Sequence, residues 1–401
     1  MKILLVNHFP LEGSGSGTYT RNVAVHLSKL GHAVSIIFPE NSQDISIPVG
    51  IKAHPVFFTG SKEIENALPF NFPCFTTHPR STFTFYDMTP SQISAYVSTF
   101  ENEIAKEITD FQPDIIHAQH IWILGQIVSK FGYPFLMTAH GTDLMGYQKA
   151  PDYRLYADEA VEKASKIIVI SEDIEQLVSD TFPMSKGKIV LMKNGYDNTV
   201  FFPADNNKIE VLEKFGISKA PEHLVVFVGK LAYFKGVDVL IRAAQDYHEH
   251  LNQSVHTLII GDGELAEELE SMVASLNLNN IHFLGHQSQE KLRGLYSVAD
   301  VSVVPSRREP FGLVAIEALA CGTPVVATAE GGLAEIINED VGTLVPVDDP
   351  LALSGAICQE LLREDRSNRK LKASRYAYEN YSQEKIIGEI ISVYEKIIEE
   401  N

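Results

Sequence analysis

Short runs of β-branched residues alternate with longer amphipathic stretches along the whole chain, and this alternation is the strongest constraint on its fold. In the first half, strands are expected at residues 2–6, 33–38, 114–117, 135–139, 166–170 and 188–192. After residue 203 the pattern restarts, with strands expected at residues 224–228, 257–260, 281–284, 301–304 and 324–327. Such alternation indicates parallel sheets with helices on both faces.

The repeated pattern predicts an α/β protein with two successive doubly wound, Rossmann-like domains, residues 1–200 and residues 201–377. The boundary is placed near residues 197–207, where a Phe-Pro-Ala-Asp-Asn-Asn segment interrupts the pattern. Two such domains that face each other form a central cleft at the carboxyl ends of their sheets, where open α/β folds bind ligands.

Two segments fall outside this pattern. Residues 44–100 are rich in Pro, Phe, Thr and Ser and show little periodicity, so they are interpreted as an irregular insertion, a lid or an acceptor-side wall. The final segment, residues 378–401, follows the second sheet, and its apolar spacing predicts one long amphipathic helix over residues 378–398.

The composition excludes several classes of protein. The formal net charge of −19 argues against a nucleic-acid partner and weakens attachment to an anionic membrane surface. No apolar run reaches the roughly 20 residues of a membrane-spanning helix, and the N-terminal apolar run turns polar at Asn7, too early for a signal peptide. The three cysteines are scattered, so neither a disulfide framework nor a zinc site is expected, and a cytoplasmic location fits.

A glycine-rich loop, Gly13-Ser-Gly-Ser-Gly17, follows the first expected strand and opens a helix expected at residues 19–30. Gly15, Ser16 and Gly17 could therefore approach an anionic ligand closely, although the same residues could form only a flexible turn. The spacing does not match the dinucleotide fingerprint G-x-G-x-x-G, which disfavours a dinucleotide oxidoreductase.

Histidines end two neighbouring strands of the first domain. His140 follows the apolar strand 135–139, in the segment Ala-His-Gly-Thr-Asp143, and is expected to face the cleft, with a capping or core histidine as the alternative. His117 and His120 end the strand before it, and packing explains them as well as ligand contact does.

In the second half, Gly229 and Lys230 follow a buried strand, and Lys235 lies on the turn before the next helix. Two cations that converge near a helix N-terminus would suit a diphosphate, although by themselves two solvated lysines on a loop are the simpler interpretation. Gly261 and Asp262 form a tight turn at the end of the next strand and could be no more than that turn.

The segment Glu309-Pro-Phe-Gly-Leu-Val-Ala-Ile-Glu317 joins a strand to a short helix expected at residues 311–320. The first amides of that helix form an anion site without any side-chain charge. Glu309 precedes the helix, and Glu317 lies among apolar residues in its second turn, where ribose hydroxyls could satisfy a buried carboxylate. A salt-bridged helix residue is the simpler interpretation of Glu317.

Taken together, these motifs resemble the retaining glycosyltransferases of the GT-B fold grouped as family 4. The resemblance covers nearly the whole chain. Its most specific element is the pair of glutamates separated by seven residues. It implies a GT-B arrangement in which the terminal helix crosses back to the first domain, and an enzyme that transfers a hexosyl unit from a nucleotide sugar to an acceptor hydroxyl.

The resemblance also implies roles for individual residues. Glu309 would hold hydroxyls of the donor sugar, Glu317 would hold the ribose, and His140 would contact the sugar at the reacting face. Lys230 and Lys235 would stabilise the charge that develops on the distal phosphate, aided by the amides of Phe311, Gly312, Leu313 and Val314. Lys230 departs from the Arg that is commoner in the family, which loses bidentate geometry but keeps the charge.

The residues around the expected cleft show no Asp-x-Asp or His/carboxylate cluster, so metal-independent transfer without a cofactor is expected. UDP-glucose or UDP-N-acetylglucosamine is the expected donor, and a soluble small molecule or polypeptide is preferred over a lipid as the acceptor. Two alternatives stay open, a GT-B nucleotide-sugar 2-epimerase and a non-catalytic nucleotide-sugar binding protein. The sequence does not indicate an oligomeric state.

Overall fold

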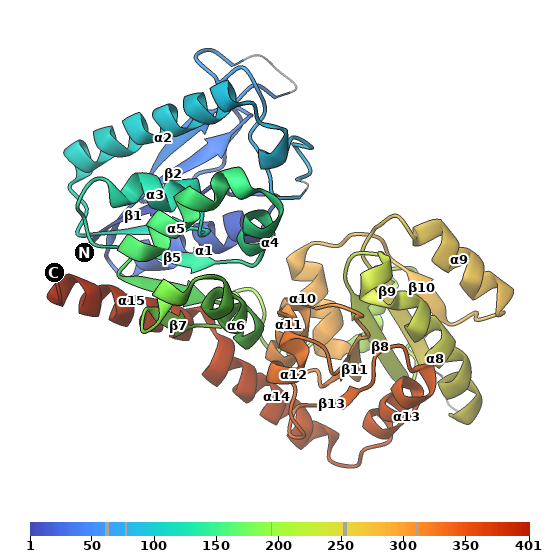
Figure 1. Cartoon of the computed structure of the whole chain (residues 1–401). Coiled ribbons are helices and arrows are strands. Elements are labelled where there is room, and N and C mark those ends of the chain that lie inside the picture. Colours follow the sequence, from blue (N-terminus) through green and yellow to red (C-terminus); the bar gives the residue numbers. More distant parts are fainter. Residues whose placement is uncertain (61–63, 77, 194, 252–254, 310) are drawn as a thin grey trace. The chain divides into compact units, whose positions relative to one another are not determined.

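The computed structural model describes the whole chain except residues 61–63, 77, 194, 252–254 and 310 (Figure 1). Contacts within the chain divide it into two units. Unit 1 comprises Met1–Lys193 together with Ile386–Asn401, and unit 2 comprises Asn194–Lys385. Each unit is built around one parallel sheet, which confirms the predicted α/β class.

Unit 1 contains a seven-stranded parallel sheet in the order β3-β2-β1-β4-β5-β6-β7. Its strands are β1 (Lys2–Val6), β2 (Ala33–Glu40), β3 (Ile51–Phe57), β4 (Ile115–Gln119), β5 (Phe135–Ala139), β6 (Lys166–Val169) and β7 (Ile189–Leu191). Its α-helices are α1 (Gly15–Lys29), α2 (Pro90–Phe111), α3 (Ile123–Ser129), α4 (Thr142–Lys149), α5 (Arg154–Lys163) and α6 (Glu172–Thr181). Short 3-10 turns lie at Phe85–Asp87, Pro151–Tyr153 and Pro183–Ser185.

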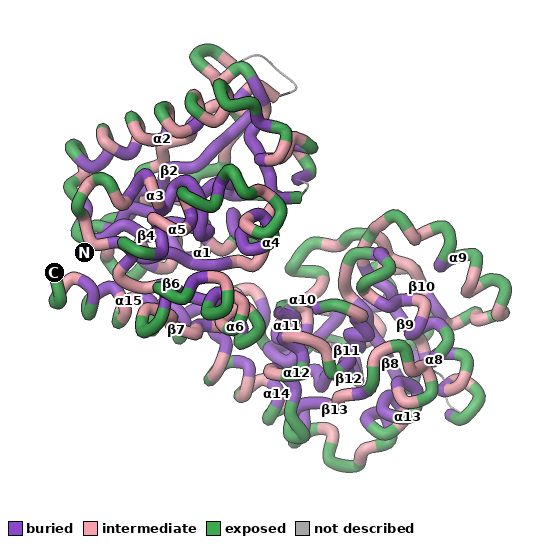
Figure 2. Tube along the Cα trace, viewed as in Figure 1, coloured by how far each residue is buried: buried purple, intermediate pink, exposed green. Residues whose placement is uncertain are grey.

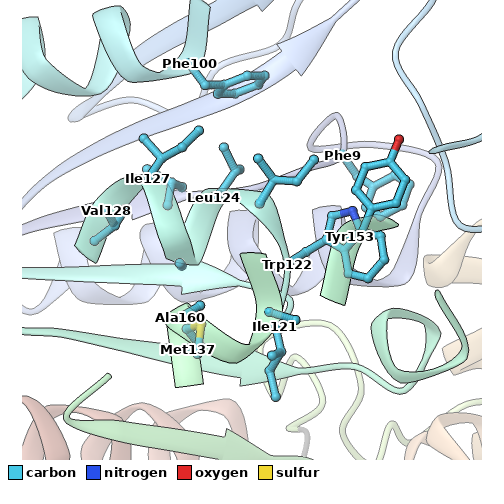
Figure 3. Packing of buried hydrophobic residues seen from close by; sticks show 14 of the residues in the cluster. Phe9, Phe100, Ile121, Trp122, Leu124, Ile127, Val128, Met137, Tyr153 and Ala160 are labelled. Carbon is cyan, nitrogen blue, oxygen red and sulfur yellow. The ribbon is translucent and has the colours of Figure 1, made fainter. Parts of the chain in front are cut away.

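The core of unit 1 forms where helices cover this sheet, whose strands are largely buried (Figure 2). On one face, Leu124, Ile127 and Val128 of α3 pack in one apolar cluster with Phe100 of α2 and Met137 of β5 (Figure 3). Burial of such side chains contributes about 1.5–3 kcal/mol each. This packing fixes the carboxyl ends of the strands that carry His120 and His140.

The other face of the unit 1 sheet is covered in part by α15 (Gln383–Glu399). Ile386, Ile387, Ile390, Tyr394 and Ile397 share a core cluster with apolar residues of β1, β2 and α1. Their spacing places them on one side of a helix. The end of the chain therefore completes the core of unit 1.

Unit 2 contains a six-stranded parallel sheet in the order β10-β9-β8-β11-β12-β13. Its strands are β8 (His223–Val228), β9 (Val255–Ile260), β10 (Ile281–Phe283), β11 (Val301–Val304), β12 (Val325–Thr328) and β13 (Gly342–Val345). Its helices are α7 (Lys208–Glu213), α8 (Val237–His250), α9 (Ala266–Ser275), α10 (Gln289–Val298), α11 (Leu313–Ala320), α12 (Gly332–Ile336), α13 (Pro350–Leu361) and α14 (Arg366–Tyr381), with a 3-10 turn at Tyr233–Lys235.

The interpretation of residues 44–100 as an irregular insertion was wrong at both ends. The segment contains β3 and the first half of α2. β3 was missed because its sequence combines the polar residues Lys52 and His54 with Pro55, which weakens a strand pattern. An edge strand tolerates proline, and β3 pairs only with β2 at the edge of the described sheet.

The prediction of one helix over residues 378–398 was also wrong, because the backbone is extended at Ser382, between α14 and α15. The Tyr196 N–H donates to Tyr381 O at 2.9 Å, and the Gln383 N–H donates to Tyr196 O at 2.9 Å. The Ser382 hydroxyl accepts from the Lys385 N–H at 3.3 Å. Bonds to a distant segment therefore replace the helical bonds that local periodicity predicts.

Candidate active site

In unit 2, the predicted site residues lie on loops that follow β8, β9 and β11, at one edge of the sheet. Gly229 and Gly261 hold the first two loops together, since the Gly229 N–H donates to Ile260 O at 3.0 Å. A Cβ atom at Gly261 would lie 1.9 Å from Gly229 O. The Asp262 carboxylate accepts from the His286 N–H at 3.2 Å. These residues thus have a structural role in shaping the loops, whatever they bind.

Lys235 and Glu309 were predicted on separate grounds, and the structure brings them together. Lys235 Nζ lies 2.5 Å from Glu309 Oε2, and the Ser306 hydroxyl donates to the same oxygen at 3.2 Å. Both side chains are mostly buried, with 18% and 9% exposed. A charge-assisted contact of this kind is strong and fixes both groups.

Glycine at position 236 permits this contact. Gly236 has φ +65°, and a Cβ atom there would lie 2.0 Å from Pro305 O. The turn that ends at Lys235 therefore lies directly against the loop that leads to Glu309.

Arg307 fixes this loop, although sequence reasoning did not single it out. Its guanidinium donates to both carboxylate oxygens of Asp238 at 2.8 Å and to Asp348 at 2.6 Å. It also lies over the Tyr233 ring, 4.1 Å from the ring centre. The hydrogen bonds to Asp238 raise the pKa of Arg307 above its already high value. Arg307 therefore positions the loop. In the sequence, the only signal for this role is that Arg307 lies two residues before Glu309.

Lys230 is placed differently from Lys235. Its Nζ lies 3.4 Å from a Glu264 oxygen, and both side chains are more than half exposed. Such a pair contributes little because solvent screens it. Lys230 can therefore leave Glu264 for another anion at small cost.

Helix α11 begins at Leu313, two residues after the predicted start, because Gly312 has φ +90° and occupies the N-cap. No side chain caps this end, and among the described residues the Leu313 and Val314 amides have no acceptor. A Cβ atom at Gly312 would lie 2.8 Å from the Leu333 side chain, and Phe311 is buried in the core of unit 2. The free amides can bind an anion.

Glu317 lies in the second turn of α11 and keeps partial solvent access. Burial raises the pKa of its carboxyl to about 8. No salt bridge to Glu317 is found among the described residues, so the simpler interpretation of a salt-bridged helix residue is not supported there. A carboxyl in this setting requires hydrogen-bond donors to ionise at neutral pH.

In unit 1, His140 follows β5 and contacts Gln119, the last residue of β4. His140 Nε2 lies 2.9 Å from Gln119 Oε1. Since an amide oxygen only accepts, Nε2 carries the proton and Nδ1 is left as an acceptor. Burial lowers the pKa of His140 to about 3, so the ring is neutral at physiological pH. Sequence reasoning missed Gln119, which no motif marks.

The two other histidines at this edge differ in role. His117 is held by Tyr394 of α15 and by Thr138, both at 2.7 Å, so it ties the terminal helix to the sheet. His120 has φ +71° and is almost fully buried. Neither of its ring nitrogens has a partner among the described residues. Its ring lies 4.7 Å from that of His140.

The glycine loop of unit 1 begins helix α1. The Ser14 side chain accepts from the Gly17 N–H at 3.0 Å and so caps the helix. A Cβ atom at Gly17 would lie 1.9 Å from Pro10 O, whereas Gly15 has open space around it. Ser16 is buried, and its carbonyl accepts from the Thr20 hydroxyl at 2.7 Å. Gly17 and Ser16 therefore serve packing, and Gly15 is the residue of the three that a ligand can approach.

The described residues contain no group of three or more His, Cys, Asp or Glu side chains placed to hold a metal ion. No helix in that part of the chain combines the length and apolar character needed to cross a membrane.

Comparison with known proteins identifies the class. The chain resembles a sucrose-phosphate synthase from Thermosynechococcus elongatus over 100% of both chains, with a TM-score of 0.74 and 22% identity. It also resembles Anabaena HepE in complex with UDP and glucose, with a TM-score of 0.67 and 19% identity over 98% of this chain and 99% of the other. These likenesses establish the GT-B fold of glycosyltransferases.

Sequence comparison then gives the family. The "Glycosyltransferase Family 4" model matches residues 13–200, and the "Glycosyl transferases group 1" model matches residues 209–380. A D-inositol 3-phosphate glycosyltransferase of Mycobacteroides abscessus is 31% identical over 90% of this chain and 82% of its own length. The chain belongs to glycosyltransferase family 4, and it is a glycosyltransferase enzyme.

Proposed function

We propose that this enzyme transfers a hexosyl unit from a UDP-sugar to a hydroxyl of a soluble acceptor, with retention of the anomeric configuration and without a metal ion. One observation carries the proposal: the uncapped start of α11 lies between Glu309, paired with Lys235, and Glu317, whose carboxyl has no salt bridge among the described residues. Anion-binding amides flanked by two carboxyl groups suit a ligand that combines phosphate with hydroxyl groups.

Each residue of this edge has a proposed part in binding the donor. The amides of Leu313 and Val314 receive the diphosphate, and Lys230 and Lys235 supply its counter-charge. The Glu317 carboxyl accepts from the ribose hydroxyls, which favours its ionised form. Glu309 accepts from hydroxyls of the hexose. In unit 1, His140 Nδ1 is proposed separately as an acceptor for a sugar hydroxyl.

The chemistry proposed for this site is departure of UDP with attack of the acceptor on the same face. The bond between the anomeric carbon and the phosphate oxygen breaks, and the sugar carbon gains positive charge. The acceptor oxygen bonds to that carbon and releases its proton to the departing phosphate. The lysines and amides stabilise the charge on the leaving group, which is the main catalytic contribution and replaces a metal ion.

UDP is proposed as the nucleotide because a protein of the same fold, Anabaena HepE, was solved with UDP and glucose. UDP-glucose is the first donor to test and UDP-N-acetylglucosamine the second. A thermal-shift panel of UDP-, GDP- and ADP-sugars tests which nucleotide the enzyme binds, since a ligand that binds only the native state raises Tm. The UDP-sugars should raise Tm most, and a panel in which none does contradicts the assignment of the donor.

A further inference from the structure

We propose that unit 1 carries a pocket for a neutral, polyhydroxylated ligand such as a sugar or polyol, formed by segments 41–44 and 79–82 together with Ile64 and Asn71. The pocket has a volume of about 730 Å³, within the range of small-molecule sites. In terms of the proposed function, on which this assignment rests, the ligand is the acceptor of the hexosyl unit.

The two segments are held together by one buried carboxylate, that of Glu40 at the end of β2. Both terminal nitrogens of the Arg80 guanidinium contact this carboxylate, one of them at 3.2 Å. The same carboxylate accepts from the Asn41 N–H at 2.8 Å and the Ser42 N–H at 3.1 Å. Glu40 therefore fixes both sides of the pocket.

Side-chain amides add a second set of bonds between the segments. Asn41 Nδ2 donates to Asn71 Oδ1 at 2.9 Å and to Arg80 O at 3.1 Å. Asn71 Nδ2 donates to the same Arg80 carbonyl at 2.9 Å. A wall that is already ordered before the ligand arrives loses less entropy on binding. The pocket is thus a formed site within unit 1.

The pocket adjoins the glycine loop through His78. His78 Nε2 donates to Glu12 O at 3.0 Å, and His78 Nδ1 accepts from the Arg80 N–H at 3.1 Å. A Cβ atom at Gly13 would lie 2.7 Å from His78 Nε2. The segment that lines the pocket is therefore attached to the loop that contains Gly15, where a ligand can approach.

The charges of the lining indicate the class of ligand. Arg80 is the cation among the described lining residues, and its charge is neutralised by Glu40. Asp44, which also lines the pocket, is exposed and would repel an anion. The other polar lining groups are amides and hydroxyls, which both donate and accept as sugar hydroxyls do. The lining favours a neutral sugar or polyol over a phosphorylated one.

Saturation-transfer NMR on the full chain tests this assignment, with and without UDP. The probes are sucrose, maltose and myo-inositol as neutral ligands, and glucose 6-phosphate and myo-inositol 1-phosphate as anionic ones. Thr82→Trp fills the pocket from an exposed position whose side chain has no hydrogen bond among the described residues. Gln43→Trp does so from the opposite segment. Thr109→Trp, on the exposed side of α2, is the matched control.

At least one neutral probe should bind, with Kd raised at least tenfold by either pocket variant and unchanged by Thr109→Trp. The assignment is overturned if no neutral probe binds, including the case in which only phosphorylated probes bind. It is also overturned if a neutral probe binds both pocket variants with the Kd of the wild type. UDP binding is measured in parallel as a Tm increase. If UDP does not raise Tm, the proposed donor site is contradicted while the neutral-probe result stands. The two failures are therefore distinguishable.

Discussion

The predicted site residues of the two units differ in their electrostatics. In unit 2, Lys235, Glu309 and Arg307 are charged and held in ion pairs. In unit 1, the carboxyl ends of β4 and β5 carry His120, His140 and Gln119, which are neutral or kept neutral by burial, and the ion pair of Glu40 with Arg80 lies apart from them, after β2. This difference is the one that the proposed function requires, with a charged donor bound by unit 2 and hydroxyl groups bound by unit 1.

The largest effect is expected at the charged edge. Glu309→Ala should lower kcat by about 10³-fold or more, because it removes the hydroxyl acceptor and leaves the Lys235 cation without its partner. The measurement is initial-rate kinetics with the UDP-sugar. Glu339→Ala, at an exposed position of the same unit, is the control. Turnover of Glu309→Ala within a few-fold of wild type would show that the assigned role is wrong.

Acidification should lower the free energy of unfolding of unit 1. Burial lowers the pKa of His8, His117 and His140 to about 3, so the unfolded chain binds more protons than the folded one between that pH and about 6.5. Stability is therefore present above pH 6.5 and lost as pH falls, by about 1–2 kcal/mol per histidine between pH 6.5 and 5.

Trp122, the single tryptophan of the chain, is buried in unit 1 and reports this loss. Its fluorescence in urea should show a lower unfolding midpoint at pH 5 than at pH 7. An unchanged midpoint would mean that these histidines are not buried as neutral rings.

Gln119→Leu should lower kcat about tenfold, because the His140 ring loses the partner that sets its tautomer. The Kd for UDP should not change, since the proposed nucleotide site lies in unit 2. Gln119→Glu should keep the contact but raise the pKa of His140, so that kcat becomes pH-dependent near neutrality. Equal losses in UDP affinity and kcat for Gln119→Leu would point to a structural role alone.

Glu317→Gln should produce the smallest change in kcat, together with an increase of about tenfold in the Kd for UDP. Its effect on stability has the opposite sign to that of the histidines. Burial raises the pKa of Glu317 to about 8, so the folded state loses stability as pH rises from about 4.5 to 8. Thermal unfolding of the ligand-free variant at pH 8.5 should therefore give a higher Tm than wild type, and a lower Tm would indicate a stabilising ionised carboxylate.

Much of this fold could be read from local pattern, because buried parallel strands give continuous apolar runs. β3 could not be read in this way, since an edge strand accepts Pro55 and the polar residues Lys52 and His54. The start of α2 was readable from the Thr89–Gln92 capping box that precedes its apolar face. The break at Ser382 depends on Tyr196, which is remote in sequence.

The candidate site divides in the same way. Residues in motifs, such as Glu309 and His140, could be named from the sequence. Their contacts with Lys235 and Gln119 could not be predicted, because residues distant in sequence meet only in the folded chain. Gly261 shows the converse. Its motif position suggests a ligand, whereas the closeness of the Gly229 carbonyl, 1.9 Å from where a Cβ atom would lie, explains the glycine by packing.

The central proposal is that a UDP-hexose is cleaved at the start of α11 with retention. Proton NMR of UDP-α-glucose during slow hydrolysis by the enzyme, with water as the acceptor, tests it most directly because no acceptor has to be known. The first glucose formed should be the α anomer, observed before mutarotation. Glucose that forms first as the β anomer would contradict the account.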